Sequence, residues 1–194
     1  MDICAVVLCG GKSTRMGTNK ALLPINDKPV IEHIIHKLRK LTDEIILITN
    51  DKEAYEYLQL PMYRDRFDDA GPLAGIESAM YHVHAEKYMF VACDMPFIQA
   101  DVYKYLVQTI AHHDAVVPIF EGRVHPLASI YKRTALPIIQ EKLLKDDLRV
   151  RSFYDEIDIK YVDKFPNVDK KTIEQHFFNM NNPEQYEQAK EIFD

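Results

Sequence analysis

The chain of 194 residues is 47% hydrophobic, which suits one globular domain over residues 1–194 that buries a substantial core without disulfides or structural metal ions. Its net charge of −6 argues against a nucleic-acid or membrane surface, since both favour a positively charged footprint. Three cysteines with no Cys-x-x-Cys pair fit reduced thiols, and no leader-like or membrane-spanning run is evident, so we expect a cytoplasmic protein.

The first predicted element is a buried strand over residues 3–8, which leads into a glycine-rich, cationic loop. Gly10 and Gly11 lack Cβ atoms, so their backbone N–H groups can approach an anion closely. Positive charge follows at Lys12, Arg15 and Lys20. On an acidic chain, this local charge at a strand end indicates a site for a small phosphate-bearing anion rather than for a polymer. An ordinary strand-to-helix turn with solvated lysines is the structural alternative.

The Gly-Lys-Ser triplet at residues 11–13 invites comparison with the phosphate-binding P-loop. That motif needs another glycine five positions before its second one, and Val6 occupies that position here. Because Val6 lies inside the predicted strand, where no phosphate loop can begin, the P-loop interpretation fails.

Downstream segments alternate between helical and strand patterns. Pro29 fits the first turn of an amphipathic helix that ends near residue 41, and residues 44–49 then form a second buried strand, expected to be parallel to the first. This alternation predicts an α/β fold with a mostly parallel sheet, in which a later strand pairs antiparallel with its predecessor across a turn at 121–122. The later predicted elements are a short helix over 52–58, helices over 76–83, 102–110, 135–144 and 183–193, and strands over 88–92, 115–119, 127–131 (the antiparallel one) and 157–162.

Two further segments follow predicted strands, where ligands bind in an open parallel sheet. The first contains Arg64, Asp65 and the Gly-Pro-Leu-Ala-Gly run at 71–75, which is expected to turn into the next helix and could be a simple cap. The second is 91–96, where an apolar strand ends in Asp94 ahead of a proline. A carboxylate there can hold Mg²⁺ through one oxygen and leave other positions to phosphates and water. An N-cap or turn role is the alternative, and the cationic loop favours metal binding.

Together these motifs resemble the nucleotidyltransferase family, and within it the MobA-type molybdenum cofactor guanylyltransferases. The resemblance implies a three-layer α/β/α Rossmann-like nucleotidyltransferase fold whose N-terminal half binds the nucleotide and whose C-terminal half binds the pterin substrate. It also implies transfer of GMP from GTP to the terminal phosphate of molybdenum-bound molybdopterin, with release of pyrophosphate. The matching motifs span nearly the whole chain in the family's order: Gly10-Gly11, Arg15-Met16-Gly17, Lys20-Ala21-Leu22-Leu23, Lys28-Pro29, 71–75, Cys93-Asp94-Met95-Pro96, Arg123 with His125-Pro126, and 179–183.

The same resemblance assigns roles to individual residues. Asp94 would bind Mg²⁺, and Asn179 and Asn181 would face molybdopterin with His125 nearby, although a structural hydrogen bond is an equal alternative for His125. Cofactor insertion proteins and acceptor molybdoenzymes are the further partners that such an activity suggests. The residues implied to line or contact the GTP site are Leu8, Cys9, Gly10, Lys20, Asp65 and Asp94.

Charge determines the expected mechanism, because both reactants are anions. Arg15 and Lys20 are expected to stabilise phosphate oxygens while Asp94 holds the Mg²⁺ that orients the triphosphate, and these three residues form the predicted catalytic set. No general base is needed when the nucleophile is an ionised phosphate. Three positions depart from the family pattern: Cys9 stands for the usual alanine, Asn19 for an aspartate before the lysine, and Asn26-Asp27 lacks a glycine before Lys-Pro.

The remaining titratable side chains show no comparable pattern. His33 and His36 lie three apart on a predicted helix without a third metal ligand, so surface placement is expected. Helix ends or solvent-facing turns are expected for four other histidines, and solvated positions for two acidic pairs. These residues are His82, His84, His112, His113, Asp68-Asp69 and Asp146-Asp147.

Two other functions stay open from the sequence. A triphosphate loop does not identify the base, so a cytidylyltransferase for the same pterin or a sugar-phosphate nucleotidyltransferase is an alternative, although the short chain weakens the sugar reading. A noncatalytic nucleotide sensor or carrier is the other alternative. Lys20 and Asp94 argue against it, because a protein that only binds nucleotide could dispense with the metal carboxylate.

Overall fold

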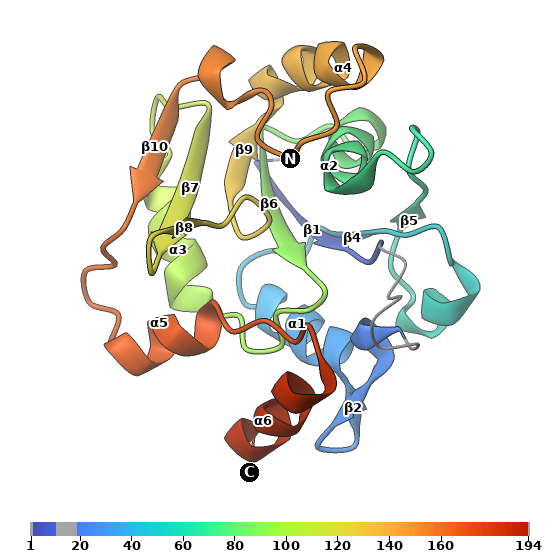
Figure 1. Cartoon of the computed structure of the whole chain (residues 1–194), viewed down its shortest axis with the longest axis vertical. Helices are drawn as coiled ribbons and strands as arrows, with labels where there is room; N and C mark the ends of the chain where they lie inside the picture. Colours follow the sequence, from blue (N-terminus) through green and yellow to red (C-terminus); the bar gives the residue numbers. More distant parts are fainter. Residues whose placement is uncertain (1, 11–18, 194) are drawn as a thin grey trace.

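The computed structural model describes residues 2–10 and 19–193, and a central sheet runs through it with helices on both sides (Figure 1). The strand order is β10-β7-β9-β6-β1-β4-β5, with β8 attached to β7. β1 pairs in parallel with β4 and β6, β4 with β5, and β7 with β10, whereas β9 is antiparallel to both its neighbours. The predicted mostly parallel sheet with an antiparallel element is confirmed. The strands are β1 Ile3–Leu8, β4 Ile45–Ile48, β5 Met62–Tyr63, β6 Lys87–Ala92, β7 Ala115–Phe120, β8 Arg123–Val124, β9 Ile130–Lys132 and β10 Ile159–Val162.

Helices cover both faces of this sheet and give the expected three layers. Along β1, Ala5 and Val7 point into the core on one face, and Cys4, Val6 and Leu8 point into the core on the other. Strands buried on both faces read as continuous apolar runs, which is why the central strands were predictable. None of the described helices has the length and apolar character needed to cross a bilayer. The first face carries α1 (Val30–Leu38), α3 (Ala100–Thr109), α5 (Lys170–His176) and α6 (Pro183–Phe193), and the second carries α2 (Gly71–His82) and α4 (Leu136–Leu144).

α2 begins earlier than its sequence pattern predicts. The run at 71–75, expected to be a turn before a helix over 76–83, is the first part of the helix itself. Asp69 and Gly71 have φ of 51° and 68°, so two left-handed residues lead the chain into it. Pro72 is tolerated because the N–H it lacks would have no acceptor within the first turn. Glycine and proline, which indicate a break in most contexts, here begin a helix.

A hairpin formed by β2 (Pro24–Ile25) and β3 (Lys28–Pro29) was not predicted. Its turn residues Asn26 and Asp27 have φ of 47° and 59°, the two consecutive left-handed positions typical of a type I′ turn. Asn and Asp tolerate this conformation better than other non-glycine residues. The missing glycine before Lys-Pro is therefore compensated by residues that can adopt the same turn.

The antiparallel strand expected over 127–131 occurs as the shorter β9, and its place in the sheet differs from a simple hairpin. Glu121 and Gly122 form the predicted turn with φ of 49° and 72°, and β8 pairs with β7 immediately after it. β9 then lies between β7 and β6. It therefore joins the part of the sheet formed by β6, β1, β4 and β5 to the part formed by β7 and β10. α5 was also missed, because a helix of seven residues gives no periodic signal.

Candidate functional site

The predicted site residues gather at the edge of the sheet where the parallel strands end. β1, β4 and β6 end level with one another. The segments that follow start side by side, since the Cys9 N–H donates to the Ile48 carbonyl at 2.9 Å and the Cys93 N–H donates to the Leu8 carbonyl at 3.3 Å. The start of the glycine-rich loop therefore lies beside the turn that carries Asp94.

Asp65 lies at this edge and is held by one neighbouring side chain. The Asn50 amide donates to Asp65 Oδ2 at 3.1 Å, and the Asp65 N–H donates back to Asn50 Oδ1 at 3.2 Å. Asp65 Oδ1 is buried and has no hydrogen-bond partner in the described part of the chain. A Cβ atom on Gly10 would lie 3.9 Å from Asp65 Oδ2, so the loop starts next to this carboxylate. Burial raises the pKa of Asp65, and the Asn50 hydrogen bond opposes that rise.

Gly75 of α2 approaches the same carboxylate from the other side. A Cβ atom on Gly75 would lie 3.0 Å from Leu8 Cδ2 and 3.6 Å from Asp65 Oδ1. The first of these contacts is too short for van der Waals packing without movement of Leu8. The second glycine of the 71–75 run therefore serves close packing of α2 against the end of β1 and has no role in a turn.

Asp94 follows β6 and presents a second buried carboxylate oxygen. Its Oδ1 has no hydrogen-bond partner among residues 2–10 and 19–193. Burial raises the pKa of Asp94, and the positive charge of Lys20 opposes that rise. A desolvated carboxylate oxygen without a protein donor fits a hard cation such as Mg²⁺, which binds one or two carboxylates together with phosphates and water. The residues present thus fit the expected magnesium position.

The C-terminal segment holds Lys20 close to Asp94. Lys20 Nζ donates to Asn181 Oδ1 at 3.1 Å. One residue earlier in the chain, the Met180 N–H donates to the Asp94 carbonyl at 2.8 Å. Two hydrogen bonds from adjacent residues therefore tie Lys20 and Asp94 to one loop, and Asn181, predicted from the family motif, belongs to this cluster.

Asn19 performs two tasks at the position where an aspartate is usual. Its Oδ1 accepts the Ala21 N–H at 3.2 Å and caps the 3-10 helix η1 (Lys20–Leu22). Its amide nitrogen donates to the buried Tyr55 hydroxyl at 2.8 Å. The Tyr55 hydroxyl can also donate to Asn19 Oδ1 at 3.1 Å. The amide can therefore act as donor or acceptor toward Tyr55, whereas a carboxylate could cap the helix but could only accept. The orientation of Lys20 is thereby set without an extra negative charge beside it.

Cys9 and Cys93, at the ends of adjacent strands, form a thiol pair within the site. The neighbouring Cys93 thiol and burial both raise the pKa of the Cys9 thiol, which donates to the Val7 carbonyl at 3.8 Å. Both cysteines are free thiols. Replacement of the usual alanine by Cys9 therefore adds volume without adding charge at neutral pH.

His125 and Asn179 meet around Phe177, in the C-terminal half of the chain. The His125 ring lies 4.5 Å from the Phe177 ring, and Asn179 Nδ2 donates to the Phe177 carbonyl at 2.8 Å. Burial lowers the pKa of His125, so its imidazole is neutral at physiological pH, and its Nε2 is buried with no partner in the described chain. An unpartnered ring nitrogen is available to a ligand, whereas the ring packing is structural.

Some residues singled out from the sequence fall outside the described residues or outside the strand-end cluster. Arg15 falls outside the described residues, as does Lys12, so the described site contains Lys20 and Asp94 of the catalytic set. His33 is half-buried, against expectation, because its Nε2 lies 2.8 Å from the Ile25 carbonyl oxygen, whereas His36 is exposed as predicted.

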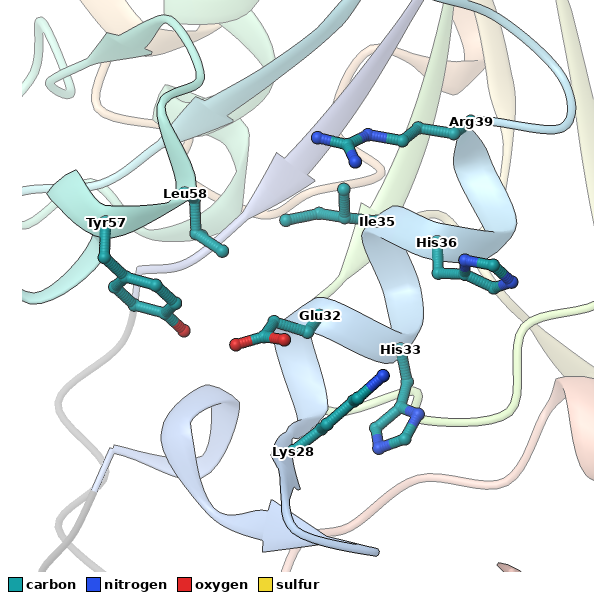
Figure 2. Close-up of a pocket in the computed structure, with 8 residues that line it drawn as sticks. All are labelled: Lys28, Glu32, His33, Ile35, His36, Arg39, Tyr57 and Leu58. Carbon is teal, nitrogen blue, oxygen red and sulfur yellow. The ribbon is translucent and has the colours of Figure 1, made fainter.

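His33 and His36 line a hollow of about 430 Å³ between α1 and the 3-10 helix η2 (Glu53–Leu58), which replaces the short helix expected over 52–58 (Figure 2). Lys28 and Arg39 share this hollow with Glu32. Charges of both signs line it, and none of the predicted nucleotide or metal residues does. The predicted site is therefore the strand-end cluster rather than this hollow.

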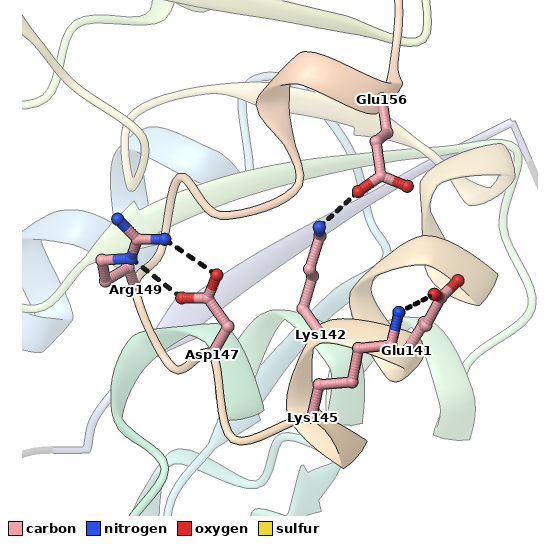
Figure 3. Close-up of polar contacts among 6 residues, drawn as sticks. All are labelled: Glu141, Lys142, Lys145, Asp147, Arg149 and Glu156. Atoms are coloured by element: carbon pink, nitrogen blue, oxygen red, sulfur yellow. Dashed lines mark hydrogen bonds and ion pairs between the residues drawn. The ribbon is translucent and has the colours of Figure 1, made fainter.

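In the acidic pair Asp146-Asp147, Asp147 is only half-exposed, against expectation. Asp147 accepts two hydrogen bonds from Arg149, both at 2.8 Å, and these lower its pKa (Figure 3). Asp146, Asp68 and Asp69 are exposed. Figure 3 also shows Lys142 paired with Glu156 and Lys145 with Glu141, so this region is a network of surface ion pairs. Such pairs contribute little stability each and do not form a ligand site.

Two site residues were missed from the sequence. Asn50 lies two residues after β4, so its position past a strand end was the available signal. Tyr55 lies 36 residues from Asn19 and has no local signal for the contact.

Comparison with known proteins identifies relatives over nearly the whole chain. The family model described as "MobA-like NTP transferase domain" matches residues 5–160. A "Probable molybdenum cofactor guanylyltransferase" of Carboxydothermus hydrogenoformans is 35% identical over 192 residues, covering 99% of this chain and 97% of that protein. A protein of the same name from Clostridium perfringens strain 13 is 36% identical over 186 residues, covering 94% and 93%.

Solved structures show the same similarity. The crystal structure of molybdopterin-guanine dinucleotide biosynthesis protein A from Archaeoglobus fulgidus has a TM-score of 0.83 with this chain at 25% identity. The match covers 97% of each chain. The similarity therefore includes the C-terminal segments that hold Asn179 and Asn181, beyond the region matched by the family model.

Proposed function

Because the chain belongs to the MobA-like NTP transferase family, we propose that it transfers GMP from GTP to the terminal phosphate of molybdenum-bound molybdopterin and releases pyrophosphate. The observation that carries this proposal is the convergence of Lys20, Asp94 and Asp65 at one edge of the sheet. Two of these side chains are carboxylates with a buried oxygen that has no hydrogen-bond partner among the described residues, which is costly in a folded protein unless a ligand supplies the missing partner.

Asp65 supports guanine as the base. Guanine presents N–H donors at N1 and N2 on one edge, whereas cytosine presents a single amino donor beside acceptors. The Asn50 amide occupies Asp65 Oδ2 and leaves Oδ1 as an acceptor for such donors. A base that places an acceptor against Asp65 Oδ1 would leave both groups unsatisfied, which costs about 1–3 kcal/mol for a buried group.

The phosphate chemistry is assigned to Lys20 and Asp94. Lys20 would stabilise negative charge on the phosphate oxygens during in-line attack at the α-phosphorus, and the C-terminal loop would hold its ammonium in place. Asp94 Oδ1 would hold Mg²⁺, which when bound supplies positive charge to the triphosphate. Arg15, from the sequence motif, is the proposed second cation. The acceptor phosphate attacks as an ion, so no side chain has to remove a proton.

The pterin side of the site is assigned to the C-terminal half. Asn181 contacts Lys20, Asn179 is held by the Phe177 carbonyl, and His125 offers an unpartnered ring nitrogen beside them. We assign these three polar side chains to molybdopterin. Cofactor insertion proteins and acceptor molybdoenzymes are the proposed recipients of the product.

Product analysis tests the proposal. Purified protein is incubated with molybdenum cofactor, Mg²⁺ and each nucleoside triphosphate in turn, and the dinucleotide product is identified by mass spectrometry. We expect a guanine dinucleotide and one pyrophosphate per product. A product formed with CTP but not with GTP would overturn the base assignment, and tight GTP binding without pyrophosphate release would identify a noncatalytic sensor instead.

A further inference from the structure

A second cluster of metal-binding side chains lies at the opposite edge of the sheet from the proposed active site. His112 and His113 precede the start of β7, and Asp158 precedes the start of β10. One donor atom of each side chain lies within 4.8 Å of the donor atoms of the other two. Among the described residues, a search for three or more His, Cys, Asp or Glu side chains with donor atoms this close together finds this group. The proposed nucleotide site takes no part in it.

Backbone hydrogen bonds hold the two segments of this cluster together. The Asp114 N–H donates to the Asp158 carbonyl at 2.8 Å, and the Asp158 N–H donates back to Asp114 Oδ2 at 3.1 Å. Thr134 Oγ1 donates to the other Asp114 oxygen at 2.6 Å. These bonds and the β7–β10 pairing fix the two backbone segments that carry the metal-binding side chains.

The histidines are held on one side of the same turn. The His113 N–H donates to the Ile110 carbonyl at 2.8 Å, which closes the turn after α3, and the rings of His112 and His113 lie 4.1 Å apart. His113 Nδ1 lies 2.9 Å from Asp158 Oδ2. One imidazole nitrogen and one carboxylate oxygen are thus already adjacent, with a second imidazole beside them.

We propose that His112, His113 and Asp158 bind a divalent transition metal ion of the Zn²⁺ type. Two imidazoles and one carboxylate are ligands that Zn²⁺ accepts, and bond lengths of ~2.0–2.1 Å in a tetrahedron space the ligand atoms ~3.3 Å apart. The 2.9 Å pair has to open slightly and the third atom has to approach, which rotation of these partly or fully exposed side chains can supply. Imidazole nitrogen favours Zn²⁺, Ni²⁺, Co²⁺ or Cu²⁺ over Mg²⁺, so this site would not compete for the ion expected at Asp94.

Charge around the cluster permits a cation. Asp114 and Asp158 each contribute a negative charge, and Lys132 contributes one positive charge nearby because its Nζ donates to the Ala111 carbonyl at 2.6 Å. The two carboxylates and Lys132 together carry a net charge of −1. A bound ion would join the turn after α3 to the start of β10, so its binding would stabilise the folded chain.

Metal titration of the untagged full chain tests the proposal. Protein stripped with a chelator and held in excess Mg²⁺ is titrated with Zn²⁺ by calorimetry and with Co²⁺ by visible absorption. We expect one equivalent with the ligand-field bands of a four-coordinate site. We also expect a rise in Tm of roughly 5–10 °C at 100-fold excess of Zn²⁺ over its Kd.

Two variants and one control separate this site from others. The double variant His112→Ala with His113→Ala should weaken Zn²⁺ binding at least ~10-fold, because loss of a ligand costs no less than loss of a group that orients one. At the same Zn²⁺ concentration, the Tm shift should fall by about half or more. Asp158→Asn should weaken binding while keeping side-chain volume. His84→Ala, an exposed histidine that precedes β6 at the same sheet edge, should change nothing.

Either of two results would overturn the proposal. It fails if the wild-type chain takes up no Zn²⁺ or Co²⁺, or if the His112 and His113 double variant binds with unchanged stoichiometry and affinity. Should the double variant fold poorly, the single variant His112→Ala at an exposed position decides, and unchanged affinity there also refutes the site. Nucleotide transfer should be unaffected in all these variants, because the cluster lies at the far sheet edge.

Discussion

Substitution of Asp94 by asparagine should separate activity from stability. Asp94 Oδ1 is buried without a hydrogen-bond partner in the described chain, so the ionised carboxylate is held for a ligand at a cost to the folded state. Asparagine keeps the volume and removes the charge. We expect Asp94→Asn to slow nucleotide transfer by ~10²-fold or more, as loss of a group that stabilises transition-state charge does.

Asp94→Asn should change the stability only slightly, and any change should make the folded chain more stable. An unsatisfied buried polar group costs about 1–3 kcal/mol, and only part of this is recovered, because the amide also lacks a partner and the attraction to Lys20 is lost. The free energy of unfolding should therefore stay unchanged or rise by about 1 kcal/mol. For a chain of this size, that corresponds to a Tm increase of roughly 2–4 °C.

The pH dependence follows from the raised pKa of Asp94. The folded chain holds this proton more tightly than the unfolded chain, whose value is near 3.8, so the cost of ionisation is absent below that pH. As pH rises through the folded pKa, the cost develops and stability falls. The Tm difference between Asp94→Asn and wild type should thus be smallest at acidic pH and largest at neutral pH.

Calorimetry of both proteins across this pH range, beside an assay of pyrophosphate release, measures the effect. Asp163→Asn is the matched control, because Asp163 is exposed and its substitution should alter neither property. Adding Mg²⁺ should raise the Tm of wild type more than that of Asp94→Asn. A loss of more than about 1 kcal/mol in the variant would show that Asp94 stabilises the fold and would refute the reasoning.

Three further substitutions test the rest of the site. Lys20→Ala should lower kcat by ~10²-fold, and a change confined to GTP affinity would assign it to ground-state binding instead. Asn50→Ala removes the side chain that hydrogen-bonds to Asp65, and initial rates should show a larger rise in KM for GTP than fall in kcat. An unchanged KM would contradict a positioning role for Asn50. Gly75→Ala places a Cβ 3.0 Å from Leu8 Cδ2, and the overpacking cost of about 1–3 kcal/mol is offset by about 1 kcal/mol of helix propensity. We expect urea titrations to show a free energy of unfolding lower by up to about 2 kcal/mol, and a gain in stability would mean that Leu8 moves freely.

The expectation that the predicted site residues lie at one edge of the sheet rests on a general fold rule. Buried apolar strands separated by helices give a parallel sheet, and the residues after strand ends then lie at one edge, as Gly10, Asp65 and Asp94 do. The departures at Asn19 and Asn26-Asp27 could be named from the sequence but not interpreted. Their explanation lies in the Tyr55 hydroxyl and in left-handed backbone angles, which only the folded chain reveals.

Contacts between distant residues were not predictable. Lys20 meets Asn181 across 161 positions, and no local pattern encodes this hydrogen bond. The antiparallel pairing of β9 with its predecessor β7 was predicted and is confirmed, whereas its second pairing, with β6, had no signal in the sequence. Short elements carry too few residues for a periodic signal, so tertiary pairing decides their place.

The contact between Lys20 and Asn181 has a consequence for how the site can work. Asn181 is neutral and exposed, so the hydrogen bond that Lys20 makes to it contributes at most about 1.5–3 kcal/mol, the range for a bond to one charged group. Lys20 can exchange it for a stronger bond to a charged phosphate oxygen. An aspartate at the same position would hold the ammonium as an ion pair and compete with the substrate for its charge. Lys20 is therefore positioned by a neutral partner, and Asp94 Oδ1 has no hydrogen-bond partner among the described residues. Both groups thus keep their capacity to interact for the phosphates and the metal ion that we assign to them.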